Sequence, residues 1–340
     1  MELTGQVALV TGASRGLGLA LARELLRRGC RVAVCARDPE ELERARVELA
    51  RDGADVLAVP CDVSNRDQVE ELVARTVDQF GSLDVLITNA GVIQVGPLPT
   101  MRVEDFEDAM GVMFWGVVLP TLAALPHLRE TRGRIVTITS IGGKVAAPHL
   151  LPYDAAKFAA VGFSEGLAAE LAREGVRVTT VVPGLMRTGS PLNAFFKGQE
   201  AREFSWFTVA DSVPGLSMDA ERAARRIVTA MQRGRTEVLL TAPAKLAVRV
   251  HGLMPATTVR TLGLVNRLLP RADAADQHAV RGEAAATAIG SPLFHRLIAT
   301  TRRAAERLRQ RPGPVASPAA VRSARSAPGE ATGPGDVSSS

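Results

Sequence analysis

The sequence contains little cysteine. Only three of its 340 residues are cysteines, and they form no C-x-x-C pair. Cys30, Cys35 and Cys61 each lie in or beside a short apolar run that is typical of a β-strand. The sequence therefore predicts buried, reduced thiols, with no disulfide framework and no metal site. Residues 1–10 also lack the basic and long apolar segments of a secretory signal, so we expect a cytoplasmic protein.

The sequence has no concentrated block of positive charge. Its formal net charge is +5, but the basic residues are spread along the chain and many face acidic neighbours, as in residues 40–51. We therefore expect no nucleic-acid partner. Hydrophobic residues make up 46% of the chain and charged residues 23%, which is typical of a globular protein. The length favours one large domain with an appendage.

One stretch lacks charged residues and could be mistaken for a membrane span. Residues 109–127 contain no Asp, Glu, Lys or Arg, but they include Pro120 and Pro126 and lie between two strand-like segments. A buried helix of an α/β domain has the same apolar character at this length. We predict a buried helix.

Short β-branched runs alternate with helical patterns through residue 240. This alternation predicts the α/β class, with a doubly wound, Rossmann-type parallel sheet covered by helices on both faces. The predicted strands are 6–11, 31–36, 55–60, 83–88, 134–139, 177–182 and 237–240. The predicted helices are 17–28, 40–51, 66–80, 103–129, 155–173 and 220–232.

The pattern changes after Leu240. We predict helices without strands to about Gln310, and then a disordered tail, because residues 311–340 consist largely of Pro, Ala, Ser, Gly and Arg. The predicted division is a catalytic domain over 1–240, a helical extension over 241–310 and a tail over 311–340.

A glycine-rich turn connects the first predicted strand to the first predicted helix. Glycines there allow a tight turn and let backbone N–H groups and a helix N-terminus approach a pyrophosphate. The spacing is G-x-x-x-G-x-G and not G-x-G-x-x-G, so an ordinary turn with three glycines is the alternative. The predicted phosphate-binding residues are Gly12, Ser14, Arg15, Gly16, Leu17 and Gly18.

The second predicted strand ends without the acid that would hold the ribose 2′-hydroxyl of NAD. Arg37 follows this strand, and Arg15 lies in the glycine turn. With no acid expected to oppose them, the two guanidinium groups favour a 2′-phosphate and therefore NADP(H) as cofactor. The alternative is two solvated surface arginines. Asp38 precedes Pro39 and is interpreted as a helix N-cap.

With these features the sequence resembles the short-chain dehydrogenase/reductase (SDR) family over residues 3–240. The residues that carry the resemblance are Thr11, Gly12, Gly16, Leu17 and Gly18, then Asp62 and Val63, Asn89, Ala90 and Gly91, Ser140, Tyr153 and Lys157, and Pro183 and Gly184. The resemblance implies cofactor contacts from Asp62 and Val63 at the adenine, from Asn89, Ala90 and Gly91 along the cleft, and from Pro183, Gly184 and Thr188 at the nicotinamide. It also implies a homodimer or homotetramer that pairs through the helix after Tyr153.

The chemistry of Tyr153 can be argued from the residues themselves. A carbonyl that accepts hydride needs a proton at its oxygen, and a free tyrosine with a pKa of about 10 is a poor proton carrier near neutrality. Lys157 lies one helical turn later on the same face and can stabilise the phenolate. Ser140 can hydrogen-bond the substrate oxygen. The predicted catalytic residues are therefore Ser140, Tyr153 and Lys157, and the latter two also contact the cofactor; a structural tyrosine is the alternative.

Met113 departs from the family pattern. Many family members carry an asparagine there, which holds a water that relays protons toward the lysine. Either methionine fills core space while water reaches Lys157 by another route, or the catalytic cycle is slowed or lost. The second interpretation gives an alternative function, a nucleotide-sensing binding protein with little turnover.

Two segments point to an apolar substrate. Five of the thirteen aromatic residues lie between Thr188 and Met218, as a lid over a lipophilic substrate or as a packed subunit contact. Residues 243–270 contain four basic residues, no acid and many apolar residues, so they either cover the core or contact an anionic membrane peripherally. We expect the two segments to form one apolar entrance to the site of an NADP(H)-dependent oxidoreductase acting on a carbonyl or alcohol carbon.

Overall fold

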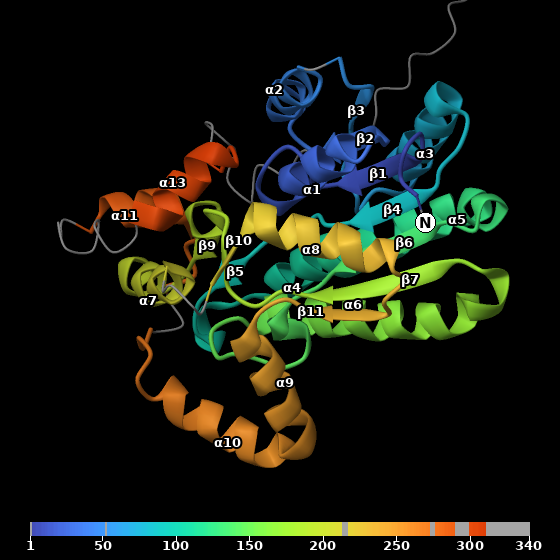
Figure 1. Ribbon diagram of the computed structural model, residues 1–340. Coiled ribbons are helices and arrows are strands. Elements are labelled where there is room, and N and C mark those ends of the chain that lie inside the picture. The colour runs from blue at the N-terminus through green and yellow to red at the C-terminus, as the bar shows by residue number, and fades with distance from the viewer. Residues whose placement is uncertain (1, 52, 213–216, 273–275, 290–298, 311–340) are drawn as a thin grey trace, which may run out of the picture.

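A seven-stranded parallel sheet, in the order β11-β7-β6-β4-β1-β2-β3, forms the centre of the computed structural model (Figure 1). The structure describes residues 2–51, 53–212, 217–272, 276–289 and 299–310. Every predicted strand is present, with ends that differ by no more than two residues. The strands are β1 (Val7–Thr11), β2 (Arg31–Ala36), β3 (Val56–Pro60), β4 (Val85–Thr88), β6 (Arg134–Ile138), β7 (Arg177–Val182) and β11 (Glu237–Leu239).

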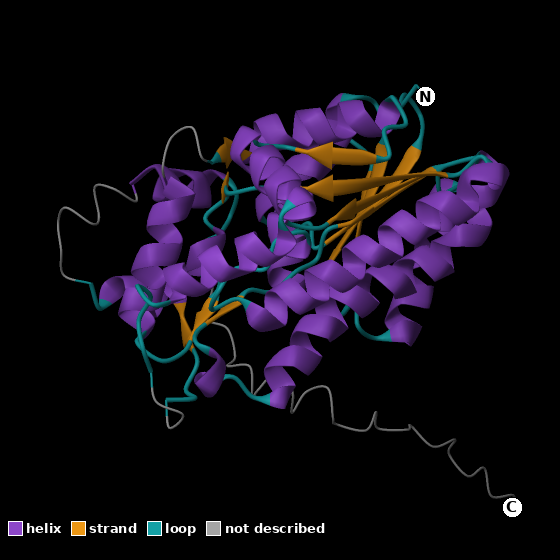
Figure 2. Cartoon of the chain, turned by 90° about the horizontal axis from the view of Figure 1, so that it is seen from below, coloured by secondary structure: helices purple, strands orange, loops and turns teal. Residues whose placement is uncertain are grey.

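Helices cover both faces of this sheet, as Figure 2 shows. One apolar core lies beneath α1 (Gly16–Arg27), α2 (Pro39–Leu49) and α8 (Ala220–Gln232). A second core lies beneath α3 (Arg66–Phe80), α5 (Gly116–Thr131) and α6 (Leu151–Glu170). All five residues of β1 are buried, as expected for a strand covered on both faces. The doubly wound, Rossmann-type fold is therefore confirmed.

The charge-free stretch forms part of the second layer. Val103–Thr131 runs through α4 (Val103–Met110), a π-helical turn (Gly111–Trp115) and α5. Its mean hydropathy of 1.7 over 18 residues is high enough for a membrane span by composition alone, but half of that window is buried. The segment packs against α3, β4 and α6, which agrees with the predicted core helix.

The extension contains a strand, so the prediction of helices alone is wrong. β12 (Val280–Arg281) pairs antiparallel with β9 (Phe195–Phe196), which pairs parallel with β5 (Gln94–Val95). A two-residue strand is too short to show alternation in the sequence. A further small sheet joins β8 (Met186–Arg187) and β10 (Met218–Asp219). The other helices are α7 (Glu200–Ser212), α9 (Ala242–Leu253), α10 (Pro255–Asn266), α11 (Gly282–Thr287) and α13 (Ala299–Arg307).

The helices α9 and α10 project from the body of the protein (Figure 1). Helix α10 has no buried residue, and Ala244 is the one buried residue of α9. Large apolar side chains are therefore left in solvent: Leu246, Val250, Leu253, Met254, Val259, Leu264, Val265 and Leu268. The interpretation of residues 243–270 as a core cover is wrong for α10. Residues 311–340, with the predicted tail, lie outside the described residues.

Candidate active site

One cavity of about 1000 Å³ lies at the carboxyl edge of the central sheet, where the chain order reverses between β1 and β4. Most of the predicted site residues line it: Gly12, Ser14, Arg15, Leu17, Arg37, Asp62, Val63, Asn89, Ala90, Gly91, Ser140, Tyr153, Lys157, Pro183, Gly184 and Thr188. Gly16 and Gly18, which were predicted to contact the cofactor, are absent from this lining.

Gly18 acts through packing. A Cβ atom at this position would lie 2.2 Å from the carbonyl oxygen of Gly12 and 2.6 Å from Nδ2 of Asn89. Glycine therefore lets the first turn of α1 approach the end of β1 closely. The close approach keeps the N-terminus of α1 at the cavity, where its positive end favours a phosphate.

Asn89 forms hydrogen bonds that stabilise the glycine turn after β1. Its Nδ2 donates to the carbonyl oxygens of Thr11 and Gly12, at 3.0 Å each, and its backbone N–H donates to Oγ1 of Thr11 at 3.0 Å. These bonds join the ends of β1 and β4 on either side of the topological switch. Asn89 thereby fixes the shape of the cleft.

The extension covers the glycine turn, which sequence analysis did not predict. The backbone N–H of Gly16 donates to the carbonyl oxygen of Leu308 at 2.8 Å. Gln310 lines the cavity beside Gly16, and Nδ2 of Asn193 donates to its backbone and side-chain oxygens at 2.6 Å each. No local sequence signal marks Leu308 or Gln310, because their role depends on a contact between the two ends of the described chain.

The prediction that no acid opposes the two arginines is wrong. Glu41 pairs with Arg15, with 3.0 Å between Nη1 and Oε1. Asp38 is the N-cap of α2, as predicted, and accepts from the backbone N–H groups of Glu40 and Glu41 at 2.9 Å each. This cap places Glu41 in the first turn of α2, opposite the glycine turn. Arg37 lines the same part of the cavity.

The predicted catalytic residues meet at the next strand ends. Tyr153 and Lys157 lie one turn apart in α6, and Nζ of Lys157 is 5.9 Å from the centre of the Tyr153 ring. Nζ donates to the carbonyl oxygen of Ile138 at 3.0 Å. Burial lowers the pKa of Lys157 to about 8. A protonated Lys157 beside the phenol favours the phenolate.

Ser140 follows β6 and faces the same cavity. Its Oγ accepts from the backbone N–H of Gly142 at 3.0 Å, which leaves the hydroxyl proton available for a substrate oxygen.

Asp154 is a site residue that sequence analysis missed. It lines the cavity and is 1% exposed. Its Oδ2 accepts from the backbone N–H of Ala147 at 2.7 Å, whereas Oδ1 has no hydrogen-bond partner among the described residues. Burial raises the pKa of this carboxyl to about 8. Acidic residues are common in the first turn of a helix, so the position of Asp154 after Tyr153 does not indicate a role in the site.

Met113 is fully buried in the π-helical turn. A Cβ atom at Gly91 would lie 3.8 Å from its sulfur, so the thioether packs beside the cofactor cleft. The methionine fills core space, which is compatible with both interpretations of this position.

The two predicted apolar segments reach the same cavity. Trp206 and Phe207 of α7 line it together with Ala247 of α9 and Leu262 of α10. Glu203 of α7 contacts the segment before α6, because its carboxylate lies 2.9 Å from Nδ1 of His149. The same carboxylate accepts from Nε1 of Trp206, on the same helix, at 2.7 Å.

Other aromatic residues of the segment are buried by the extension. Phe196 and Phe204 are fully buried and pack edge to face, with 5.4 Å between ring centres. Ala285 and Ala286 of α11 belong to the same apolar cluster. The added helices thus supply burial that the aromatic segment requires.

Comparisons with known proteins agree with this geometry. The short chain dehydrogenase family model matches residues 6–195. A 3-oxoacyl-(acyl-carrier-protein) reductase from a Synechocystis species is 39% identical over 188 residues, which are 55% of this chain and 76% of that protein. An 11-beta-hydroxysteroid dehydrogenase A from Sesamum indicum is 34% identical over 247 residues, which are 72% of this chain and 70% of that protein.

A solved structure has the same fold. The short-chain type dehydrogenase/reductase from Mycobacterium marinum has a TM-score of 0.62 and 25% identity, and the match covers 72% of this chain and 96% of that one. The family match spans more than half of the chain, and the family's catalytic residues meet in one cavity with its glycine turn. The chain therefore belongs to the short-chain dehydrogenase/reductase family of oxidoreductases.

Proposed function

We propose that this protein transfers a hydride between NADP(H) and the carbonyl or alcohol carbon of an apolar substrate, with Tyr153 as general acid and base. The observation that carries the proposal is the Lys157 ammonium group 5.9 Å from the Tyr153 ring, in a cavity that also contains the glycine turn. These residues fit a nicotinamide dinucleotide, since the cavity combines a helix N-terminus with a proton donor.

The glycine turn, Arg15 and Arg37 would hold NADPH, which when bound would supply the hydride for reduction of a carbonyl carbon. Tyr153 donates its phenolic proton to the carbonyl oxygen. Lys157 stabilises the resulting phenolate through its positive charge. Ser140 donates a hydrogen bond to the same oxygen and orients it toward Tyr153. In the direction of oxidation, the Tyr153 phenolate accepts the alcohol proton.

The preference for NADP(H) is supported by Arg15 and Arg37, which both line the nucleotide end of the cavity. Glu41 offsets part of the charge of Arg15, and the proposed selection of a 2′-phosphate depends on the charges of both arginines.

An apolar substrate is supported by the opposite end of the cavity. Trp206, Phe207, Leu150 and Leu262 line it and present aromatic and aliphatic surface. The name of the Sesamum indicum relative, a hydroxysteroid dehydrogenase, supports the same substrate class. Each 100 Å² of apolar substrate surface that this wall covers contributes about 2.5 kcal/mol to binding.

We also propose that α9 and α10 bind the surface of an anionic bilayer, so that a cytoplasmic protein takes its substrate from a membrane. Residues 243–270 contain Lys245, Arg249, Arg260 and Arg267 and no acid. Leu253 and Leu268 are 84% and 86% exposed. Since Ala247 and Leu262 line the cavity, the same segment connects the bilayer contact to the substrate end.

Vesicle sedimentation tests the membrane contact. The full chain should sediment with phosphatidylserine-containing vesicles at low salt and be released at high salt. Leu253→Ser with Leu268→Ser should lose this binding, whereas Val47→Ser, on the exposed side of α2, should retain it. No sedimentation of the wild type at low salt would remove this part of the proposal.

A homo-oligomer is supported by a different apolar face. Trp115 and Leu122 on the α5 side and Phe158 on α6 are 49%, 57% and 40% exposed. We propose that a second copy of the chain covers them, in a homodimer or homotetramer. Light scattering should give a dimer or larger species for the wild type and a smaller one for Phe158→Glu.

The function itself is tested by NADPH oxidation with a panel of ketones and aldehydes, together with an NADPH binding titration. Turnover of polycyclic or long-chain ketones supports the proposal. Binding of NADPH without turnover of any compound would contradict it. This result would favour the alternative function considered for Met113, a nucleotide-sensing binding protein.

A further inference from the structure

A third arginine lies at the nucleotide end of the cavity, and it comes from outside the family match. Arg281, in β12 of the extension, lines the cavity together with Arg15 and Arg37. The pairing of β12 with β9 fixes its backbone, and its guanidinium carbon lies 5.8 Å from the centre of the Phe195 ring. The side chain is therefore held in position.

The polar atoms of Arg281 are poorly satisfied within the protein. Its Nε is buried and has no hydrogen-bond partner among the described residues. None of the ion pairs in the described part of the chain includes Arg281, although Glu41 and Glu283 are near enough to interact with its charge. Burial, followed by the positive charge of Arg15, lowers the pKa of Arg281. A partly buried guanidinium group whose Nε–H is buried and unpaired is costly unless an anion binds it.

Two acids lie near enough to interact with the charge of Arg281: Glu41, which is already paired, and Glu283, which forms no ion pair in the described part of the chain. Glu41 pairs with Arg15, and Asp38 accepts from two N–H groups of α2. Glu40 has a side chain that is 84% exposed and lies 3.6 Å from Arg44. A dianionic phosphate group in this part of the cavity would face Arg281 together with Arg15 and Arg37.

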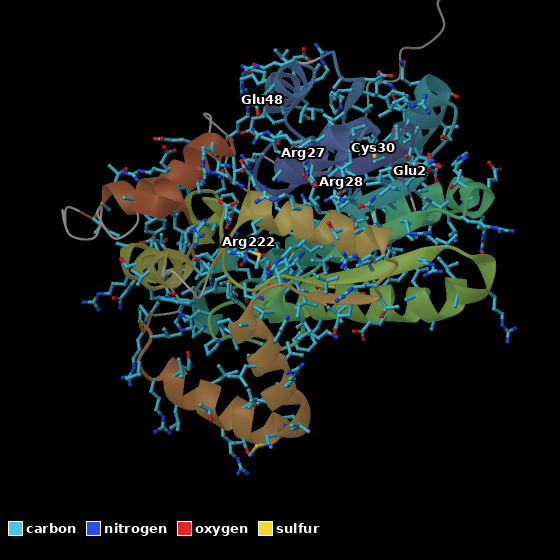
Figure 3. All side chains as sticks on the ribbon, viewed as in Figure 1. Glu2, Arg27, Arg28, Cys30, Glu48 and Arg222 are labelled. Carbon is cyan, nitrogen blue, oxygen red and sulfur yellow. The ribbon has the colours of Figure 1, made fainter. Side chains whose placement is uncertain are left out.

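The end of the extension is tied to this region by further contacts. Leu308 accepts from Gly16, as described above, and Nε of Arg309 donates to Oε2 of Glu48 at 2.5 Å. Glu48 lies on α2 (Figure 3) and also pairs with Arg23 of α1. The extension is thereby attached to both helices that border the nucleotide end of the cavity.

We infer that Arg281 binds the 2′-phosphate of NADP(H), so that the C-terminal extension completes the site that selects the cofactor. This inference rests on the proposed preference for NADP(H). It assigns a binding role to a segment outside the family match, and it explains how the site tolerates Glu41 beside Arg15.

The test compares the affinities of the full-length protein for NADPH, NADH, adenosine 2′,5′-bisphosphate and AMP. Loss of a charge-assisted contact should weaken binding of NADPH and of the bisphosphate by about tenfold or more in Arg281→Gln. NADH and AMP should bind within about twofold of the wild type, and Arg281→Lys should recover part of the loss. Arg260→Gln is the matched control, because it removes the same charge from α10, outside the cavity lining.

Two results would overturn the role of Arg281 alone. One is unchanged NADPH affinity in Arg281→Gln while Arg37→Gln loses affinity, which would leave the proposed cofactor preference intact. The other is an equal loss of NADPH and NADH affinity, together with a lower melting temperature, which would show that Arg281 acts through packing on Phe195. A wild type that binds NADH as tightly as NADPH would contradict the cofactor preference itself, and with it the role of Arg281.

Discussion

The two ends of the cavity differ in how the chain builds them. The nucleotide end lies on short turns that follow β1, β2 and β4, and its polar groups stand at fixed distances along the sequence. The substrate end is assembled from α7, α9 and α10, which come from the segment after β7 and from the extension. Most of the nucleotide end is therefore encoded locally, with Arg281, Leu308 and Gln310 of the extension added to it, whereas the substrate end depends throughout on long-range packing. Changes at the two ends should have separable effects.

The largest effect is expected at the junction of the two ends, from Tyr153→Phe. Removal of the phenolic proton should lower kcat/KM by about 10²- to 10⁴-fold. NADPH affinity should remain nearly unchanged, because the substitution removes no charged cofactor contact. Lys157→Ala should reduce both. Steady-state kinetics with a fluorescence titration separates the two quantities, and activity above about one hundredth of the wild type in the Phe variant would exclude Tyr153 as the acid.

A large effect confined to the nucleotide end is expected from Arg37→Asp. A carboxylate at this position repels a 2′-phosphate and can accept a bond from a 2′-hydroxyl, so the preference for NADPH over NADH should be abolished or reversed. The change in the ratio should be about tenfold or more. The control Arg44→Asp lies further along α2, outside the cavity lining. Equal affinity of the wild type for both cofactors would contradict the assignment.

A smaller effect confined to the substrate end is expected from Trp206→Ala. The loss of aromatic surface should raise KM for polycyclic ketones by about tenfold, while small polar ketones and NADPH are affected little. His149→Gln is a useful companion, because it should disturb α7 through Glu203 without removing the wall residue itself. A uniform change in KM for all substrates would show that Trp206 only supports the fold.

A pH-dependent effect on stability, with no direct effect on cofactor selection, is expected from Asp154→Asn. The folded-state pKa of Asp154 is about 8, raised above its ordinary value of 3.8, so the folded protein retains a proton that the unfolded chain releases between those pH values. The stabilising contribution is therefore complete below about pH 4 and is lost as the pH rises toward 8, by at most about 1.4 kcal/mol per pH unit.

Denaturant unfolding of both proteins from pH 5 to pH 8 measures this contribution. The free energy of unfolding of the wild type should fall relative to that of Asp154→Asn as the pH rises. A constant difference across this range would show that the carboxyl is ionised in the folded protein. Asp67→Asn, at the exposed start of α3, controls for the general effect of removing a charge.

The accuracy of sequence prediction follows a division between local and long-range contacts, and this division runs through the nucleotide end as well. Residues 32–36 of the second strand form a continuous apolar run, and Asp38 caps the next helix through its own backbone neighbours, so both could be predicted from local chemistry. Tyr153 and Lys157 share a helical face because they are four residues apart.

The features that sequence analysis missed depend on contacts between distant segments. Three contacts are of this kind: Glu41 with Arg15, β12 with β9, and the Leu308 carbonyl with Gly16. Hydrophobic periodicity describes each segment alone and does not indicate which distant segments pair. The strand β12 is also too short for any pattern to register. The solvent-exposed side chains of α10 could not be predicted either, because an amphipathic helix that covers a core and one that contacts a membrane have similar sequences.

Transfer of deuterium from NADPH labelled at C4 to an apolar ketone tests the central claim most directly, since it requires both ends of the cavity and Tyr153 together. The product of the wild-type reaction should carry deuterium at the carbinol carbon, as measured by mass spectrometry. The product should be absent with Tyr153→Phe and much reduced when labelled NADH replaces NADPH. A wild type that binds NADPH but transfers no deuterium to any polycyclic or long-chain ketone would contradict the account.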